Sequence, residues 1–434
     1  MLPGCLIVLV FLVLAGLMMS RRLPALLALP VMAVAIGLIS GVAGGVPHDG
    51  LRDLIFKTIL TDGAGRLSTA MMYAVFGAIL SQVVMRQGIA ARIVRLAAEY
   101  AGDRKMVLAF FMTAAIAVAF ASLTGLGAVI MIGSLALPIL IGAGLSPGFS
   151  ACLMLFGICI GGAFNLANMG LYIDVLKVDL GTVKQFATSY GTLLALAAAA
   201  FMALEARQER RRLAWAVDVG VGPQPIPTIA LLTPLVPIGL IMMPWPLNLV
   251  FQSWPIIPAF VVGMLFGLLT TEPGRLVNNL TAAVLEGLKD VAPVLGLFIG
   301  IGMVLNAMMD PSTARIMAPF ITHVIPTTKL GFVLFFTLLA PLGLYRGPLN
   351  FIGLGAGFAG LVLANNLMPP AAVMAAFLGV GQVQGVCDPT NTSNVWLAQF
   401  THTSTEDFLK RTLPFVWVFV LVALVYAVVV VGVM

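Results

Sequence analysis

Two polar stretches interrupt long apolar runs, and they carry the side chains best suited to chemistry. The first is GGAFNLAN, residues 161–168, and the second is QGVCDPTNTSN, residues 384–394. Amide, hydroxyl and carboxylate oxygens in such stretches can coordinate a small hard cation or hydrogen-bond a polar ligand. Non-helical backbone at membrane depth is tolerated only where protein or a water-filled cavity surrounds it. Matched breaks in two halves of a chain predict the binding site of a transporter.

The second break contains one acidic residue, Asp388, which is the leading candidate for binding a coupling ion. Its carboxylate would coordinate sodium, or would carry a proton if burial favours the neutral form. A helix cap ahead of the following proline is the alternative role. Thr392 and Ser393 are expected to assist ion coupling. We expect sodium, where it is the ion, to bind near Asp388, Asn391 and Asn165.

Arg346 lies at the expected tip of a membrane hairpin, where a guanidinium needs an anionic partner or a wet cavity. Its planar donor fork suits a carboxylate, so we predict that it anchors an anionic substrate. There are two alternatives to this role: Arg346 forms an ion pair with Asp388, or the hairpin tip ends near the surface. Thr124 holds the matching position in an earlier hairpin, where its hydroxyl would donate to the same anion or bond its own backbone. The other predicted substrate contacts are Gly125, Gly347, Asn165, Asn168, Thr390, Asn391 and Asn394.

Composition places these residues in a membrane protein. The 434 residues are 61% hydrophobic and only 9% charged, and the mean hydropathy is +1.09. These values exclude a soluble enzyme and predict many membrane-spanning helices. The four cysteines show no metal-ligand spacing and are expected to be core residues. Expected spans are residues 2–20, 24–45, 68–86, 148–170, 187–205, 228–246, 252–270, 291–308, 370–388 and 413–433.

Two further apolar stretches, 106–143 and 330–366, are too long for one span and too short for two. Each is broken near its middle by glycine and polar residues. We predict that both are re-entrant hairpins, with two short tilted spans as the alternative. With the N-terminus outside, this topology puts the basic clusters 210–212 and 410–411 in the cytoplasm, as the positive-inside rule requires. It leaves Arg52, Lys57 and Arg66 in an outside loop.

The two halves align as a repeat. Residues 91–93, Ala-Arg-Ile, match 314–316, and Leu-Ser-Pro at 145–147 matches Leu-Met-Pro at 367–369. Each repeat is predicted to contain a span, an interfacial helix (88–103 or 310–325), a hairpin and a broken span, with inverted topology. The predicted N-terminal half is 1–205 (scaffold spans 1–67, repeat 68–205) and the C-terminal half is 225–434 (scaffold spans 225–290, repeat 291–434). A basic cytoplasmic linker, 206–224, joins them. An amphipathic arm, 273–290, holds Glu286 and Asp290 in structural roles.

This order of elements resembles the ion transporter superfamily of secondary carriers, which includes gluconate, citrate and dicarboxylate carriers and the large membrane subunit of tripartite periplasmic transporters. The stretch SLTGLGAVIMIGSLALPILIGAGLSPGFSA, 122–151, carries the resemblance most strongly, together with DPTNTSN, 388–394. The resemblance implies an all-α polytopic fold and an elevator mechanism, in which a transport domain of hairpins and broken helices slides against a scaffold. It also implies a homodimer.

The expected function is cation-coupled symport of a small organic anion, a carboxylate or dicarboxylate, with sodium or protons as the coupling ion. A sodium/proton antiporter and a channel are the alternatives, and Arg346 favours the anion carrier. An enzyme is not expected, since the sequence lacks the HExxH pattern and a Cys–His pairing. We expect no cofactor, no nucleic-acid partner and a place in the bacterial cytoplasmic membrane. Dependence on a periplasmic binding protein stays open.

Overall fold

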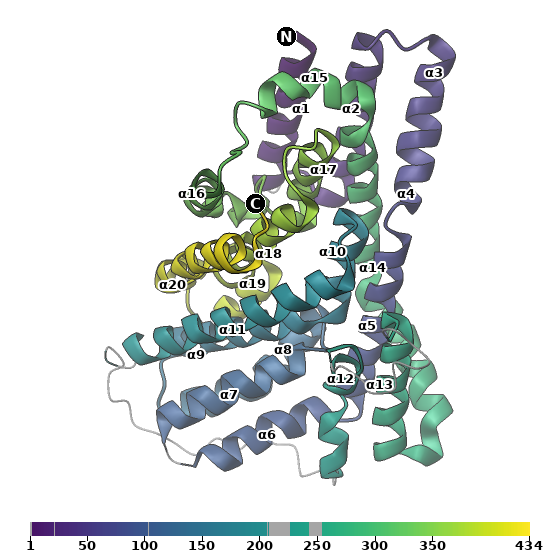
Figure 1. The fold of residues 1–434 in the computed structure, drawn as a ribbon. Helices are drawn as coiled ribbons and strands as arrows, with labels where there is room; N and C mark the ends of the chain where they lie inside the picture. Colours follow the sequence, from purple (N-terminus) through teal and green to yellow (C-terminus); the bar gives the residue numbers. More distant parts are fainter. Residues whose placement is uncertain (1, 21, 103, 206, 208–225, 243–253) are drawn as a thin grey trace.

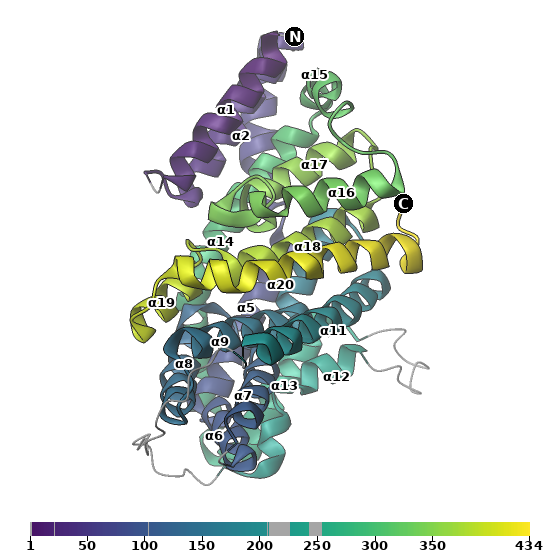
Figure 2. The same cartoon turned by 90° about the vertical axis from the view of Figure 1, so that its left-hand side faces the viewer.

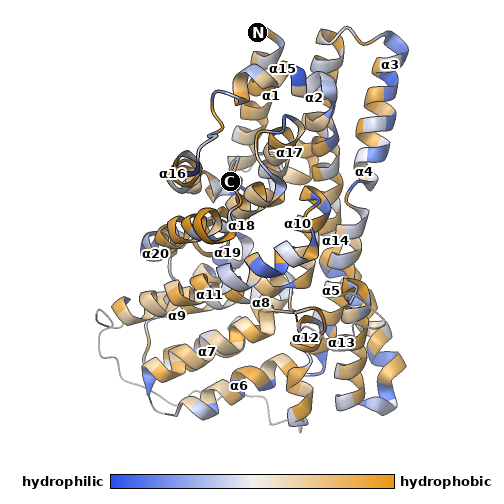
Figure 3. Cartoon of the chain, in the orientation of Figure 1, coloured by the Kyte–Doolittle hydropathy of each residue, from blue (hydrophilic) through white to orange (hydrophobic). Residues whose placement is uncertain are grey.

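The structure is a computed structural model that describes every residue except 1, 21, 103, 206, 208–225 and 243–253. The described residues form helices joined by turns, with no strand among them (Figure 1, Figure 2). In this part of the chain, ten helical stretches are long and apolar enough to cross a membrane. Apolar residues run along nearly every helix, and hydrophilic ones gather at places such as α3 and the α10–α11 connection (Figure 3). The chain is a multi-pass membrane protein, as its composition predicts.

One set of helices runs along the long axis of the molecule, and we call it the axial group (Figure 1). Its members are α1 Leu2–Met19, α2 Ala25–Ala43, α3 His48–Asp53, η1 Leu54–Asp62, α4 Gly63–Gly65, α5 Ser68–Arg86, α13 Ile256–Thr271 and α14 Leu276–Met309. The central member is α14, which packs against both α2 and α5. The short elements η2 Thr228–Leu232, α12 Val236–Met242 and η3 Pro273–Arg275 flank α13.

Two predictions for the axial group are wrong. The stretch 46–67 was expected to be an outside loop, but residues 48–62 are helical and belong to a 39-residue helical stretch, His48–Arg86. The charged residues of this stretch made it look like a loop in the sequence. Its apolar face, Leu54, Ile55 and Ile59, is nevertheless buried against α2. The arm at 273–290 is not separate from the span at 291–308 either, because α14 runs unbroken for 34 residues through Pro293.

The remaining long helices form two sets of five, which we call the hairpin group. The first set is α7 Lys105–Phe120, α8 Gly125–Gly142, α9 Pro147–Phe164, α10 Leu166–Leu176 and α11 Leu180–Glu205. The turn between α7 and α8 spans residues 121–124, which overlaps the predicted hairpin turn. A single residue, Asn165, separates α9 from α10, so the predicted break of the 148–170 span is confirmed. The short α6 Ile89–Ala101 precedes this set.

The second set of the hairpin group is α16 Lys329–Leu339, α17 Ala356–Ala364, α18 Pro370–Cys387, α19 Thr392–Thr401 and α20 Thr405–Tyr426, which η6 Ala427–Val431 extends. Residues 388–391 separate α18 from α19, which confirms the second predicted break. Between α16 and α17 lie two irregular turns, η4 Ala340–Arg346 and η5 Phe351–Gly355. The helix α15 Pro311–Ile321 precedes this set, as α6 precedes the first. Most of the predicted linker and the end of the 228–246 span lie outside the described residues.

The broken helices lie at the centre of the molecule. Of the apolar window in α18–α19, 72% is buried, and for α9 the value is 67%, whereas only 22% of α1 is buried. In Figure 2, α18 passes behind α20 and above α9, which places both breaks among other helices. The unpaired backbone groups of each break are therefore surrounded by protein, which is the condition for irregular backbone in a membrane protein.

Close packing of α9 against α7 depends on Gly161. A Cβ atom added at Gly161 would lie 2.3 Å from the carbonyl oxygen of Ala117 and 2.8 Å from the carbonyl carbon of Phe120. Both contacts are with backbone, which cannot rotate away. The crossing of α7 and α9 thus fixes the distance between the first hairpin and the first broken helix.

We expect Gly161→Ala to lower the free energy of unfolding by about 1–3 kcal/mol, because overpacking forces the helices apart. Gly16→Ala in α1 is the matched control, since a Cβ there meets nothing within 4 Å and alanine favours a helix. Thermal unfolding of both variants in detergent measures the effect. Equal midpoints for the two variants would show that the α7–α9 contact is not tight.

Candidate functional site

The first break is closed by one side chain. Asn165 caps α10, where its Oδ1 accepts from the backbone N–H of Ala167 at 3.1 Å. Its Nδ2 donates to the carbonyl oxygens of Phe120 at 3.3 Å and Leu123 at 3.2 Å, at the end of α7 and in the following turn. Asn165 is 2% exposed. The amide therefore connects the first break to the first hairpin. These bonds keep Asn165 at the first break and away from Asp388 and Asn391, beside which it was predicted to bind sodium.

The second break leaves oxygen atoms without partners. Asn391 caps α19 by accepting from the N–H of Ser393 at 3.2 Å. Asp388 is fully buried, and its Oδ1 accepts from the backbone N–H and the hydroxyl of Thr390, each at 2.8 Å. Nδ2 of Asn394 donates to the carbonyl of Val386 at 2.9 Å. Within the described part of the chain, Oδ2 of Asp388 and Oδ1 of Asn394 are buried without a hydrogen bond.

Arg346 faces a cavity of 460 Å³, which we call the Arg346 cavity. Thr390, Thr392 and Gln399 line it from the second break and α19, and Tyr345 lines it from the hairpin turn. The other walls are apolar, and they come from the α1–α2 turn and the helix ends beside it, from Leu126 at the start of α8, and from Val395 and Trp396 on α19. Arg346 is exposed to this space. Among the described residues it has no hydrogen bond and no ion pair, so the alternative of a pair with Asp388 is wrong.

The turn that carries Arg346 is strained. Tyr345 and Arg346 have φ values of 55° and 57°, in the left-handed region that side chains other than glycine rarely adopt. Each such residue costs about 1 kcal/mol or more, and strain of this kind concentrates at ligand sites. The N–H of Gly347 then donates to the carbonyl of Leu344 at 2.9 Å and closes the turn. The surrounding fold thus holds Arg346 in an orientation that a relaxed chain would avoid.

A second cavity, of 180 Å³, is lined by side-chain amides, and we call it the amide cavity. Its polar lining comes from Asn168 and Tyr172 on α10, Asn350 in the second hairpin, and Gln382 and Gln384 on α18. Only Asn168 was a predicted site residue. The signal for the others was in the sequence, since Gln384 opens the second polar break and Asn350 follows the hairpin tip by a few residues. Of the predicted site residues, Arg346, Thr390 and Thr392 thus line one cavity and Asn168 lines the other, and the rest line neither.

The remaining predicted residues lie at turns. Thr124 precedes α8, and its N–H donates to the hydroxyl of Ser81 at 3.3 Å. Gly125 has φ +83°, which favours glycine at the first hairpin turn. Ser393 lies in the first turn of α19. None of these three side chains, nor Gly347, lines either cavity.

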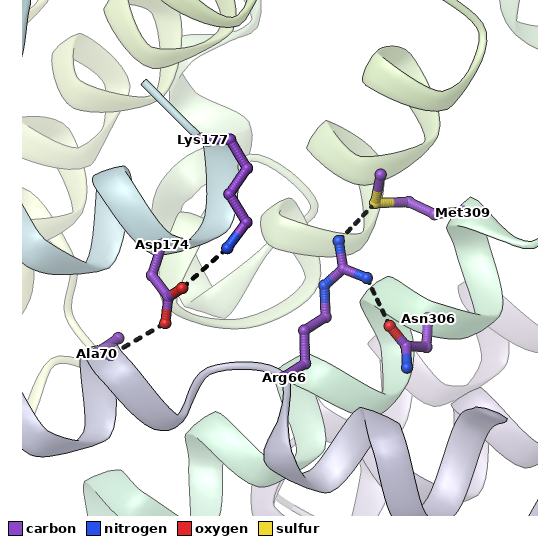
Figure 4. A network of polar contacts seen from close by, with 6 residues as sticks. All are labelled: Arg66, Ala70, Asp174, Lys177, Asn306 and Met309. Carbon is purple, nitrogen blue, oxygen red and sulfur yellow. Dashed lines mark hydrogen bonds and ion pairs between the residues drawn. The ribbon is translucent and has the colours of Figure 1, made fainter. Parts of the chain in front are cut away.

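A polar network joins the two groups of helices (Figure 4). Asp174 on α10 accepts from the N–H of Ala70 in the first turn of α5 at 3.0 Å and from Nζ of Lys177 at 2.9 Å. Nearby, the guanidinium of Arg66 donates to Oδ1 of Asn306 at 2.5 Å and to Sδ of Met309 at 3.0 Å. Lys177 is exposed just after the end of α10, as a loop residue would be, whereas Asp174 is buried within α10. Arg66 lies in the turn between α4 and α5 and is half-buried.

Other charged residues have structural partners. Glu286 pairs with Arg86 at 2.7 Å, and Oδ2 of Asp290 accepts from Nε2 of Gln82 at 2.5 Å. Asp179 precedes α11. The hydroxyl of Thr182 and, to a smaller extent, its backbone N–H donate to the Asp179 carboxylate and lower its pKa. The predicted structural roles of Glu286 and Asp290 agree with these contacts.

Two solved transporter structures share this fold. The YdaH transporter of Alcanivorax borkumensis aligns with a TM-score of 0.63 and 16% sequence identity, over 97% of this chain and 96% of that one. MtrF of Neisseria gonorrhoeae, assigned to a class of antimetabolite efflux pumps, aligns with a TM-score of 0.60 and 14% identity, over 93% and 94% of the chains. Known protein families and curated proteins give no sequence match.

At these identities the likeness shows the fold alone. The fold is that of polytopic membrane transporters, and no enzyme is among these two structures. It does not place the chain in the ion transporter superfamily that the sequence resembles. What the protein carries has to be argued from its own cavities.

Removal of the Asp174 carboxylate tests the contact between the two groups. Asp174→Ala would leave the Ala70 N–H without its acceptor, and we expect the free energy of unfolding to fall by about 1–3 kcal/mol. Asp174→Asn keeps an acceptor oxygen and loses only the pair with the more exposed Lys177, which costs under about 1 kcal/mol. Thermal unfolding in detergent separates the variants. If both lose the same stability, the N–H bond to Ala70 is not the important contact.

Proposed function

We propose that the protein is a secondary active transporter that carries a small organic anion and is driven by a coupled cation. The observation that carries the proposal is the guanidinium of Arg346. It lines a 460 Å³ cavity and has no partner among the described residues, in a fold used by transporters. A cation surrounded by apolar helices is costly unless an anion or water reaches it. The planar donor fork of arginine fits a carboxylate in two-point contact.

The neighbours of Arg346 support an anionic ligand. Thr390 and Thr392 line the same cavity on either side of Asn391, the residue that caps α19. A helix N-terminus carries partial positive charge, and its free N–H groups attract anions. Within the described part of the chain, no acidic side chain lines the cavity. The hydroxyl of Thr390 already donates to Asp388, so one cation, the hydroxyl of Thr392 and a helix N-terminus together make a site for one carboxylate group.

This arrangement favours an anion carrier over a sodium/proton antiporter. An exchanger of cations alone has little use for an unpaired arginine in its cavity, because the positive charge repels its substrates. A dicarboxylate stays within the proposal, with Arg346 holding one of its two carboxylates. Both hairpins contribute to the cavity, through Leu126 at the start of α8 and through Arg346, as expected for a site that alternates between two sides of a membrane.

For the coupling ion, we propose the unpaired oxygens of the second break. Oδ2 of Asp388 and Oδ1 of Asn394 are buried acceptors without a donor among the described residues. An unsatisfied buried acceptor costs free energy, and a carboxylate costs more. Sodium would satisfy both atoms, since it prefers oxygen ligands. A proton on Asp388 would neutralise the carboxylate and is the other candidate.

The mechanism we propose is of the elevator type. The hairpin group would slide as a transport domain against the axial group, and the orders α6–α11 and α15–α20 would be two inverted repeats. The bond between Asp174 and Ala70 crosses the boundary between the groups, so it would have to break in each cycle. We place the protein in the bacterial cytoplasmic membrane as a homodimer.

Arg346→Gln tests the anion site. We expect it to reduce uptake of labelled carboxylates in proteoliposomes at least about a hundredfold, because the charged two-point contact is lost. Arg346→Lys keeps the charge without the fork and should restore part of the uptake. Arg315→Gln, on the exposed face of α15, is the control. Normal carboxylate uptake by a folded Arg346→Gln variant would contradict the proposal.

Asp388→Asn tests the coupling site separately. The amide is close in size to the carboxylate, but it lacks the negative charge that would attract sodium and it takes up no proton near neutral pH. We expect accumulation driven by a cation gradient to be lost, while exchange of labelled for unlabelled anion continues. Asp407→Asn, at an exposed position of α20, is the control. Gradient-driven uptake at the normal level in Asp388→Asn would rule out this carboxylate as the coupling group.

A further inference from the structure

The amide cavity has no place in the proposed anion site. Its lining includes no residue of the Arg346 cavity. The two cavities use different parts of the same elements: the second hairpin contributes Tyr345 and Arg346 to one and residues 350–352 to the other. The amide cavity is lined by α18 residues that precede the second break, Gly381, Gln382, Gln384 and Gly385, whereas Thr390, within the break, lines the Arg346 cavity.

Two amides in this cavity lack protein partners. The Asn350 side chain lines the cavity, is 4% exposed, and has no hydrogen bond to any described residue. Gln384 lines the same cavity and its side-chain amide is likewise unpaired within the described ranges. Asn350 is buried and Gln384 is half-buried, so both amides are largely removed from bulk solvent, and such groups are normally paired with a ligand or ordered water.

The side-chain amides of Asn168 and Gln382 present mainly acceptor oxygens to the cavity. Nδ2 of Asn168 already donates to the carbonyl of Gly162 at 2.9 Å, and Nε2 of Gln382 donates to that of Leu378 at 3.4 Å. Their amide oxygens are left for the cavity. The ring of Tyr172 stacks on Phe351 with centroids 4.7 Å apart, which orients one wall. The lining as a whole offers both donors and acceptors.

The chemistry of this lining selects an uncharged ligand. Among the described residues, no charged side chain lines the cavity, so an ion would lose its hydration without gaining a counter-charge. An apolar ligand would leave the amides of Asn350 and Gln384 unsatisfied. The volume of 180 Å³ equals that of about six water molecules in the liquid, which suits a solute about the size of glycerol or a small amide.

We propose that the amide cavity is a second binding site, which takes a small uncharged solute bearing hydroxyl or amide groups, with Asn350 and Gln384 as its main hydrogen-bonding residues. The site is separate from the anion site and does not rest on the anion proposal. Binding of an uncharged solute there requires neither an anion nor the Arg346 guanidinium, so the two proposals fail or succeed independently.

Cys159 provides a native reporter, because it lines the amide cavity and is 8% exposed. The other buried cysteines, Cys152 and Cys387, are 0% exposed, and the exposed Cys5 is removed by Cys5→Ser. Methyl methanethiosulfonate, a small uncharged reagent, would modify Cys159 in the full-length protein in nanodiscs. Mass spectrometry of the modified peptide gives the rate. A bound solute should protect the thiol.

The probes are matched pairs that differ in charge: acetamide against acetate, and glycerol against glycerate. We expect the uncharged member of each pair to slow modification of Cys159, and the anion to have no effect at the same concentration. Asn350→Leu and Gln384→Leu should each raise the half-protecting concentration about tenfold, through loss of the amide hydrogen bonds. Gln185→Leu, at an exposed position of α11, should leave it unchanged.

Three outcomes would overturn the proposal. The first is that no uncharged probe protects Cys159, which would mean that the cavity holds water only. The second is equal protection by acetate and acetamide. The third is unchanged protection in both the Asn350→Leu and Gln384→Leu proteins, which would place the bound probe elsewhere.

Discussion

The structure depends on one constraint: backbone groups freed by a helix break inside a membrane protein must find partners within the protein. Each break is capped by an asparagine, Asn165 before α10 and Asn391 before α19. Each asparagine accepts from the following turn with Oδ1, and directs Nδ2 at carbonyl oxygens near the end of a preceding helix. Asparagine suits this role because its side chain both donates and accepts.

The two breaks satisfy this constraint differently, and our proposal for the coupling ion rests on the difference. At the first break, Asn165 uses both ends of its amide and binds α10 to the first hairpin. At the second, Asp388 and Asn394 each keep one buried oxygen unpaired within the described residues. A break whose polar groups are all paired within the protein has a structural role, whereas the buried acceptors left unpaired at the second break are the reason we propose it as the site of the coupling ion. Arg346 lies on the side of this second break.

The sequence predicted the two breaks and the interruption of each long apolar stretch, because each is a local departure from an apolar pattern, and the role of Arg346 stays a prediction on the same ground. Glycine, proline and polar residues inside a hydrophobic run mark a turn or a buried polar site much more often than a regular span. The prediction failed where a helix carries charge along one face, as in His48–Asp62, and where a proline lies inside a continuous helix, as Pro293 does in α14. Contacts such as that of Asp174 with Ala70, which are 104 residues apart, depend on packing that local patterns do not encode. The placement of the predicted site residues, in one cavity, in the other or in neither, depends on the same packing.

Both cavities share the second hairpin turn, and this has an energetic consequence. Residues 345–346 line one cavity and residues 350–352 the other, so a shift of the turn changes both linings. The turn already holds two residues at left-handed φ values, and such strain is kept only while the surroundings impose it. A ligand that favours one position of the turn in either cavity must change the affinity of the other, and thermodynamic linkage makes the effect reciprocal. The irregular turn between α16 and α17, longer than its counterpart between α7 and α8, is therefore the element through which two sites without a common residue would communicate.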